Sequence, residues 1–293
     1  MQAVTIEKPV NLRPIAKVAP VIALESGGPI AKRIDMTNEE YHSDRTAVSS
    51  SGLKELLRSP MHFQHYLNGE RQEREVFRLG TAIHAALLEP DRFAAEYLIA
   101  PDKGRSKDSK AAYEEFIKQH PGAYFISQSE MDMINGIAEQ VSKHSYASEL
   151  LKLGVAEQSF FWTDEETGIL CKCRADLLAS PFAILDVKSM EDASRESFSR
   201  SCANYNYDLS AAMYQEGIEI VTGESLEFAF LAVEKKAPHG AALYRASEEF
   251  LEKGRARFRR ALRILQDCRD ANFFPSYQPG GSFEDIDLPR WYK

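Results

Sequence analysis

The sequence predicts an α/β (α+β) protein in which helices flank a central mixed β-sheet. Three observations carry this prediction. Apolar residues recur at helical spacing up to residue 153 and again near the end of the chain. From Val155 to Lys188 the period changes to two, which is typical of strands. The 293 residues are also enough to bury a large core.

Composition narrows the class of protein. Apolar residues make up 44% and charged residues 27%, as in ordinary globular proteins, and no apolar stretch is long enough to cross a bilayer. The net charge of -8 argues against a broadly basic nucleic-acid coat protein but allows a local basic groove. Pro20 interrupts the apolar stretch 18–24, so we expect no signal peptide. With only four cysteines, we expect a cytoplasmic protein without a disulfide framework.

The first 40 residues differ from the rest of the chain. They contain four of the 13 prolines, the triplet Gly27-Gly28-Pro29 and no sustained periodicity. We therefore predict a flexible N-terminal arm over residues 1–40 and one domain over residues 41–293.

The first half of the domain is predicted to be helical. The serine run 49–51 supplies N-cap candidates for a helix over 52–58 that ends before Pro60. A second helix covers 80–88 and ends at Pro90. The other expected elements are a polar loop over 103–110 and helices over 108–119 and 128–153.

The second half is predicted to form the sheet and its covering helices. Strands over 155–162 and 169–178 flank a hairpin turn at 164–168. The remaining expected elements, in order, are a strand over 183–188, helices over 192–203 and 207–221, strands over 226–235 and 241–246, and a helix over 247–270.

The strand 183–188 carries the first candidate functional residues. Its period of two places Asp186 and Lys188 on one face. On the preceding strand, Lys172, Arg174 and Asp176 share a face, while Cys171, Cys173, Ala175 and Leu177 alternate onto the other. A short turn separates Asp176 from Asp186, so we expect the two carboxylates to converge, with Glu157 as a third.

Converging carboxylates are the hard oxygen ligands that Mg²⁺ or Mn²⁺ requires. Lys188 could then orient or help deprotonate a water molecule and offset charge on the phosphate. His84 could complete the site as a metal ligand. The alternatives are a structural Asp186–Lys188 ion pair and a structural histidine.

This ordered set of residues resembles a known family. Glu157, Asp176 and Asp186-Val187-Lys188, with Gly80-Thr81-Ala82-Ile83-His84 upstream, are similar to the exonuclease VIII (RecE) nuclease-domain family of the PD-(D/E)XK nuclease superfamily. The resemblance covers about 41–293. It includes the segments 56–60, 157–162 and 164–168 and the closing Leu288-Pro289-Arg290-Trp291.

The resemblance implies a PD-(D/E)XK fold and a specific site. Asp176 and Asp186 would bind Mg²⁺, for which Mn²⁺ could substitute. His84 would assist and the Val187 carbonyl would be a further ligand, with Lys188 as the catalytic lysine. The implied activity is a metal-dependent exodeoxyribonuclease that digests double-stranded DNA from 5′ ends and leaves 3′ single strands. It further implies DNA recombination with an annealing partner of the RecT type, a ring-shaped homo-oligomer and a bacterial or phage setting.

Two features of related RecB-type nucleases are altered or missing. Their Gln-x-x-x-Tyr helix is replaced by Ser210-Ala211-Ala212-Met213-Tyr214, so Tyr214 is expected near the DNA, with a core aromatic as the alternative. Some of these nucleases hold an iron–sulfur cluster on four cysteines in an arrangement that this chain lacks. We therefore expect no cluster.

Two basic segments stand out in the acidic chain. Residues 253–263 contain six basic residues and no acid, with Arg255, Arg259 and Arg263 on one helical face. The loop 103–110 contains four basic residues. Given a nuclease site, we expect both to follow phosphates, although a solvated surface is the alternative. The expected DNA contacts are Lys103, Arg105, Lys107, Arg174, Tyr214, Arg255, Arg259 and Arg263.

Two other functions stay open. A structure-specific DNA endonuclease would use the same metal site, and a covalently closed circle would separate it from an exonuclease. A catalytically silent DNA-binding subunit is the second. The intact Asp176, Asp186 and Lys188 argue against it, because a silent protein has no need for buried like charges.

Overall fold

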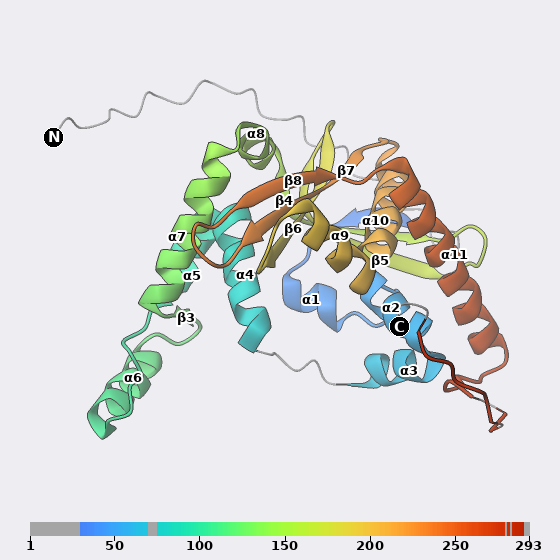
Figure 1. The fold of residues 1–293 in the computed structure, drawn as a ribbon, viewed down its shortest axis with the longest axis horizontal. Coiled ribbons are helices and arrows are strands. Elements are labelled where there is room, and N and C mark those ends of the chain that lie inside the picture. The colour runs from blue at the N-terminus through green and yellow to red at the C-terminus, as the bar shows by residue number, and fades with distance from the viewer. Residues whose placement is uncertain (1–29, 70–74, 279, 282, 290–293) are drawn as a thin grey trace.

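A six-stranded mixed sheet forms the centre of the molecule (Figure 1). The computed structural model describes all residues except 1–29, 70–74, 279, 282 and 290–293. The strands lie in the order β1-β4-β5-β6-β7-β8, and only the β6–β7 pair is parallel. Their bounds are β1 Ala31–Ile34, β4 Val155–Thr163, β5 Leu170–Ala179, β6 Ala183–Met190, β7 Glu227–Glu234 and β8 Ala241–Arg245. The predicted mixed sheet with flanking helices is therefore confirmed.

Helices cover both faces of this sheet (Figure 1). The helices of the first half are α1 Asn38–Ser43, α2 Ser50–Arg58, α3 Pro60–Asn68, α4 Glu75–Leu88, α5 Pro90–Glu96, α6 Lys107–Gln119, α7 Gln128–Lys143 and α8 Ser145–Leu153. Those of the second half are α9 Arg195–Asn204, α10 Tyr207–Thr222 and α11 Glu248–Asp270. Strands β2 Tyr97–Ile99 and β3 Tyr124–Ile126 form a separate parallel pair.

The sheet separates two hydrophobic cores. The first packs the sheet against α2, α3, α10 and α11, and we call it the α10 core. The second packs the sheet against α4, α7 and α8, and we call it the α4 core. Alternation along β6 shows the division, since Ile184 belongs to the α10 core whereas Leu185 and Val187 belong to the α4 core.

Local sequence signals explain several helix boundaries. Ser49 caps α2 and Ser59 caps α3, each by accepting a hydrogen bond from a backbone N–H of the first turn. Ser127 and Glu130 form a capping box at α7. Gly223 ends α10 in the left-handed conformation at φ 74°. These positions agree with the serine run and the terminal glycine in the sequence.

Small residues let two helices approach their neighbours closely. A Cβ added at Gly217 of α10 would lie 2.4 Å from ring atoms of Trp162 in β4. A Cβ at Gly254 of α11 would lie 2.1 Å from the carbonyl oxygen of Asp208 in α10. Both contacts are tighter than any larger side chain permits, so glycine is required at each position.

The folded structure begins earlier than the predicted boundary at residue 40. Strand β1 pairs antiparallel with the edge of β4, placing Ala31 opposite Trp162. Lys172 of β5 then holds the following segment, because its Nζ donates to the carbonyl oxygens of Tyr41 (2.6 Å) and Asp44 (2.7 Å). A four-residue edge strand shows no periodicity, which is why the sequence pattern missed it. The rest of the predicted arm, residues 1–29, lies outside the described residues.

Other boundaries differ in detail. The loop expected over 103–110 is shorter, because Ser106 caps α6 and the helix begins at Lys107. The helix expected over 128–153 is two helices, since the chain leaves helical geometry at His144, which caps α8. Arg290 and Trp291 lie outside the described residues.

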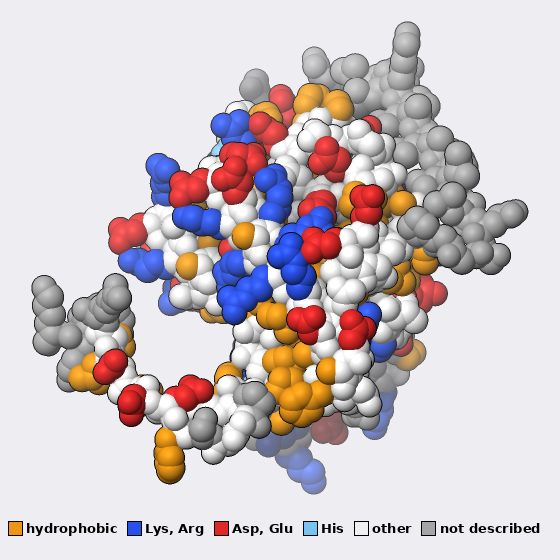
Figure 2. All heavy atoms as spheres, turned by 90° about the vertical axis from the view of Figure 1, so that its right-hand side faces the viewer, with side chains coloured by type: hydrophobic (Ala, Val, Ile, Leu, Met, Phe, Trp, Pro, Cys, Tyr) orange, Lys and Arg blue, Asp and Glu red, His pale blue; other side chains and the backbone are white. Residues whose placement is uncertain are grey.

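The C-terminal half also shapes one face of the molecule. Helix α11 covers the right-hand side of Figure 1, and Figure 2 shows basic and acidic side chains interleaved on that side. After α11 the chain returns to α3, where Phe274 stacks on Phe63 with ring centres 6.4 Å apart. None of the helices in the described part of the chain is both long and apolar enough to span a membrane.

Candidate active site

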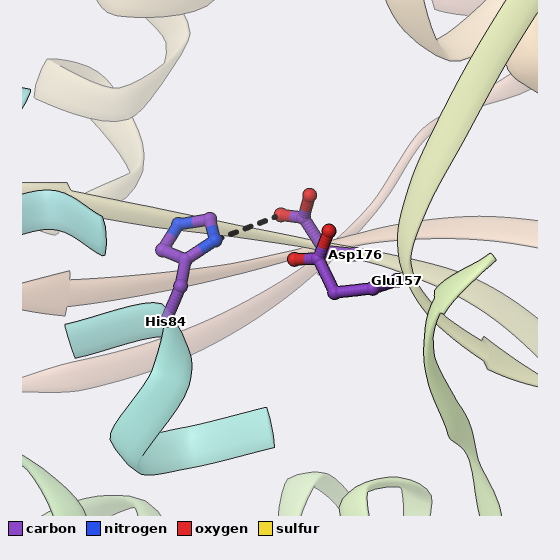
Figure 3. A group of neighbouring side chains, drawn as sticks. All are labelled: His84, Glu157 and Asp176. Carbon is purple, nitrogen blue, oxygen red and sulfur yellow. Dashed lines mark ion pairs between the residues drawn. The ribbon is translucent and has the colours of Figure 1, made fainter. Parts of the chain in front are cut away.

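Three side chains from different elements converge beside the sheet (Figure 3). His84 comes from α4, Glu157 from β4 and Asp176 from β5. One ligand atom from each residue lies within 4.8 Å of the other two, and His84 Nδ1 is 3.6 Å from Asp176 Oδ2. We call these three residues the metal cluster. All three are half-buried, so a small ion can reach them from solvent.

An irregularity in the sheet creates the cluster. Glu157 has a φ of 55°, and the β4–β5 ladder is interrupted there, because neither Glu157 nor Asp176 belongs to one of its residue pairs. On β5, Cys173 and Ala175 belong to the α10 core, whereas Leu177 belongs to the α4 core. The expectation that Leu177 shares the face of the cysteines is therefore wrong, because the strand changes face at Asp176.

Asp176 also occupies the point where β5 and β6 separate. Their ladder extends from Ala179 to Leu177, which faces Leu185. Beyond this pair, Asp176 Oδ2 accepts a hydrogen bond of 2.8 Å from the backbone N–H of Val187. This bond ties Asp176 to the strand that carries Asp186, and Val187 itself is fully buried. A shared metal site for the two carboxylates stays a prediction. A ligand role for the Val187 carbonyl stays a prediction.

Asp186 and Lys188 form a buried ion pair next to the cluster. The side chain of Asp186 is 8% exposed and that of Lys188 is 24% exposed. Burial raises the pKa of the Asp186 carboxyl, an effect that Lys188 opposes and Asp176 reinforces. The Asp186 carboxylate accepts a hydrogen bond from the Lys188 ammonium, and Asp186 does not belong to the metal cluster.

Lys188 is held in its charged form. Burial lowers the pKa of its ammonium group, but attraction by the Asp186 and Asp176 carboxylates raises the pKa by more. The net shift is therefore upward. The ammonium also lies 5.1 Å from the ring centre of Tyr207. An ammonium stabilised in this way is a poor general base and an effective fixed positive charge.

Arg174 forms an ion pair with Glu157. Its Nε lies 2.6 Å from Glu157 Oε2, and its Nη1 donates to the carbonyl oxygen of Thr37 at 3.0 Å. The guanidinium is only 10% exposed. Arg174 was expected to contact DNA. Its burial and its contacts with Glu157 and Thr37 favour a role in positioning Glu157, and contact with DNA stays a prediction. The pKa of Glu157 is raised by burial and by Asp176, while Arg174 and His84 oppose the rise.

Tyr214 lies in the interior. It packs against the α10 core, with its ring centre 6.3 Å from that of Phe228. It also lines a cavity of about 80 Å³ together with Ser50 and Tyr41. Burial raises the pKa of its phenol. This packing favours the core aromatic, and a position of Tyr214 near the DNA stays a prediction.

The three arginines of α11 that were expected to contact DNA are paired within the chain. Arg255 contacts Glu248 at 2.9 Å, Arg263 contacts Glu166 at 2.5 Å, and Arg259 bridges the buried Asp164 and Glu216. These pairs give the helix a structural role, and contact with DNA stays a prediction.

The second basic segment lies away from the cluster. Lys103, Arg105 and Lys107 are exposed at the start of α6, which projects at the lower left of Figure 1. Lys103 lies 5.3 Å from the ring centre of Tyr113. Their position beside DNA also stays a prediction.

Lys54 is a site neighbour that the sequence pattern missed. It projects from α2 and lies 5.5 Å from the same Tyr207 ring that Lys188 approaches. Burial, followed by repulsion from Lys188, lowers the pKa of Lys54 to about 8. The capping signals predicted the helix, but no signal in a short amphipathic helix indicates which distant strand it faces.

Comparisons with known proteins agree with this geometry. The family model described as a PDDEXK-like domain of unknown function (DUF3799) matches residues 49–285. A crystal structure from Eubacterium rectale, described as a "putative exonuclease", has a TM-score of 0.58 to this chain at 16% identity. The alignment covers 87% of this chain and 97% of that one. None of the curated proteins matches the chain.

Proposed function

The chain belongs to the PDDEXK-like family DUF3799, and from that premise we propose that it is a divalent-metal-dependent nuclease that hydrolyses phosphodiester bonds in DNA. The observation that carries the proposal is the metal cluster beside the Asp186–Lys188 pair. Hard carboxylate oxygens suit Mg²⁺ or Mn²⁺, and a charged lysine suits a phosphate.

The donor set fits one divalent cation. His84, Glu157 and Asp176 offer one nitrogen and two carboxylate groups within a span of 4.8 Å, and repulsion among the carboxylates contributes to the raised pKa of Glu157. Asp186 and the Val187 carbonyl are further ligands in the proposal. A bound cation supplies Lewis-acid charge and lowers the pKa of water. We propose Mg²⁺, with Mn²⁺ as a substitute.

The protein's own groups have separate roles in the proposed reaction. The Lys188 ammonium offsets the negative charge that develops on the phosphate, and Asp186 holds it in position. Because the pKa of Lys188 is raised, it acts as a fixed cation rather than as a base. Arg174 fixes Glu157, and the Val187 N–H fixes Asp176.

We propose more specifically an exodeoxyribonuclease that acts on ends of double-stranded DNA in the 5′-to-3′ direction. The similarity to the RecE family supports this, and so does the description of the Eubacterium rectale structure as an exonuclease. The same similarity supports three related proposals: a ring-shaped homo-oligomer, an annealing partner of the RecT type and a role in DNA recombination.

End-labelled duplexes test the proposed function. Linear duplexes labelled separately at each 5′ and 3′ end are incubated with Mg²⁺, with Mn²⁺ or with EDTA, beside a covalently closed circle. We expect early release of the 5′ label, an intact circle and no cleavage in EDTA. Cleavage of the circle would indicate the endonuclease, whereas no cleavage of any substrate with either metal would overturn the proposal. Light scattering of the same preparation measures the oligomer.

A further inference from the structure

A rigid corner between α9 and α10 adjoins the Asp186–Lys188 pair. The chain turns there at Tyr205 and Asn206, and Asn206 adopts the left-handed conformation at φ 53°, which is uncommon for a residue other than glycine. Arg257 of α11 holds the corner by donating to Asn206 Oδ1 and to both carboxylate oxygens of Asp208 at 3.2 Å. An unfavourable backbone geometry fixed by a neighbouring helix is typical of functional sites.

An aromatic stack leads from this corner into the sheet. Tyr205 lies 5.8 Å from Tyr207 at an interplanar angle of 27°, and Tyr207 lies 6.0 Å from Phe230 of β7 at 29°. The inner two rings pack against the α10 core, whereas Tyr205 is 61% exposed. The stack therefore ends in solvent with a flat aromatic surface whose position is fixed.

A second cation, Lys54, lies beside the same stack. Lys188 and Lys54 approach the Tyr207 ring to 5.1 Å and 5.5 Å. The two nearby carboxylates already have cationic partners, because Asp186 forms an ion pair with Lys188 and Asp208 forms one with Arg257. Among the described residues, none forms an ion pair with Lys54. Lys54 is thus a half-buried cation without a carboxylate partner, next to the residue that we assign to the reacting phosphate.

We propose that Tyr205 and Lys54 form a subsite for one nucleotide of the DNA strand next to the scissile phosphate. The base stacks on the exposed ring of Tyr205, and the phosphate of that nucleotide pairs with Lys54. This inference rests on the proposed nuclease function and adds to it a base-binding and a phosphate-binding residue. Stacking accepts any base, so the subsite would bind without sequence preference.

Fluorescence tests the stacking contact. A duplex that carries 2-aminopurine near its end is bound to protein with the substitution Asp186→Ala, so that the DNA is not hydrolysed. The further substitutions are made in this Asp186→Ala background. Stacking on a tyrosine ring quenches the fluorescence of this base. The quenching should persist with Tyr205→Phe, which keeps the ring. It should also persist with the control Tyr146→Ala, because Tyr146 lies on α8 and is similarly accessible, at 52% exposed. It should disappear with Tyr205→Ala and with Tyr205→Leu, which keeps an apolar side chain without a ring.

Kinetics and salt dependence test the same subsite in chains that keep Asp186. With Tyr205→Ala the KM for duplex should rise roughly tenfold while kcat changes less, as expected for one lost base stack. With Lys54→Gln the slope of log affinity against log salt should fall by about one, and Lys54→Arg should restore it. Melting temperatures check that each variant is folded.

The outcomes separate the two proposals. If the unsubstituted chain cleaves DNA but Tyr205→Ala behaves like Tyr146→Ala in fluorescence and KM, the subsite is wrong and the nuclease stands. An unchanged salt slope in Lys54→Gln would likewise remove the phosphate contact. If the unsubstituted chain cleaves no DNA with either metal, the proposed function itself fails.

Discussion

Asp176 Oδ2 accepts a hydrogen bond of 2.8 Å from the backbone N–H of Val187, and the same oxygen lies 3.6 Å from Nδ1 of His84. One carboxylate therefore satisfies a backbone donor where the β5–β6 ladder has ended and also belongs to the metal cluster. The position of the candidate metal site is consequently fixed by the separation of two strands. A change at Asp176 affects both the sheet and the site.

Two substitutions at Asp176 should separate these roles. Asp176→Asn keeps a carbonyl oxygen that can accept from Val187, so its free energy of unfolding should change little while hydrolysis falls by orders of magnitude. Asp176→Ala loses hydrolysis as well and should be less stable by about 1–3 kcal/mol, because a buried N–H is left without a partner. Urea unfolding in metal-free buffer measures the difference, and equal stability of the two variants would contradict the structural role.

His84→Ala should weaken the binding of Mg²⁺ or Mn²⁺ and lower activity by orders of magnitude. Its side chain is 27% exposed, so its removal leaves only a small cavity and the melting temperature in metal-free buffer should change little. Calorimetric titration with Mn²⁺ provides the measurement. Early unfolding combined with normal metal affinity would mean that His84 is a packing residue.

Lys188→Ala should abolish turnover while metal binding stays measurable by calorimetry. It also leaves the Asp186 carboxyl buried without its cation, and breaking a buried pair costs about 3–5 kcal/mol. Burial already raises the pKa of Asp186, so the folded variant binds a proton more readily than the unfolded chain. The loss of stability should therefore be largest at pH 8 and should shrink as the pH falls toward 5. The double variant Lys188→Ala/Asp186→Asn should lack this pH dependence.

Arg259→Gln should destabilise the protein by roughly 3 kcal/mol. The Asp164 side chain with which it pairs is 1% exposed, so the variant leaves a buried carboxylate without its cation. Arg263→Gln is the matched control, because its pair with Glu166 is exposed on both sides and its loss should change the free energy of unfolding much less. Urea unfolding compares them. Equal losses would mean that the Arg259 pairs are no more than surface contacts.

Lys54→Met should change how stability depends on pH. Asp186, Lys188, Asp208 and Arg257 all influence Lys54, and its pKa in the folded protein is about 8, against 10.5 for an ordinary lysine. Between these two values the unfolded chain binds more protons, so the stability of the unsubstituted protein should rise with pH by up to about 1.4 kcal/mol per unit. The variant should lack that contribution. Parallel curves for the two proteins from pH 8 to 10 would contradict the lowered pKa.

The sequence alone determined the fold class and most of the elements. A change of period at Val155, the serine caps and Gly223 are local signals, because they depend on residues that are close together along the chain. The order of Glu157, Asp176, Asp186 and Lys188 was sufficient to indicate a PD-(D/E)XK site. The central mixed sheet, confirmed by the structure, follows from the same patterns.

Only the tertiary structure decided which of these side chains meet. His84, Glu157 and Asp176 meet in the metal cluster, Leu177 lies in the α4 core, and Asp186 pairs with Lys188. Arg174 pairs with Glu157, Tyr214 packs against the α10 core, and packing of α2 brings Lys54 to the ring of Tyr207. These relationships join segments far apart in the chain, and strand pairing and helix packing set them. Periodicity assigns a residue to a face of its own element, but it carries no information about what the opposing element places there.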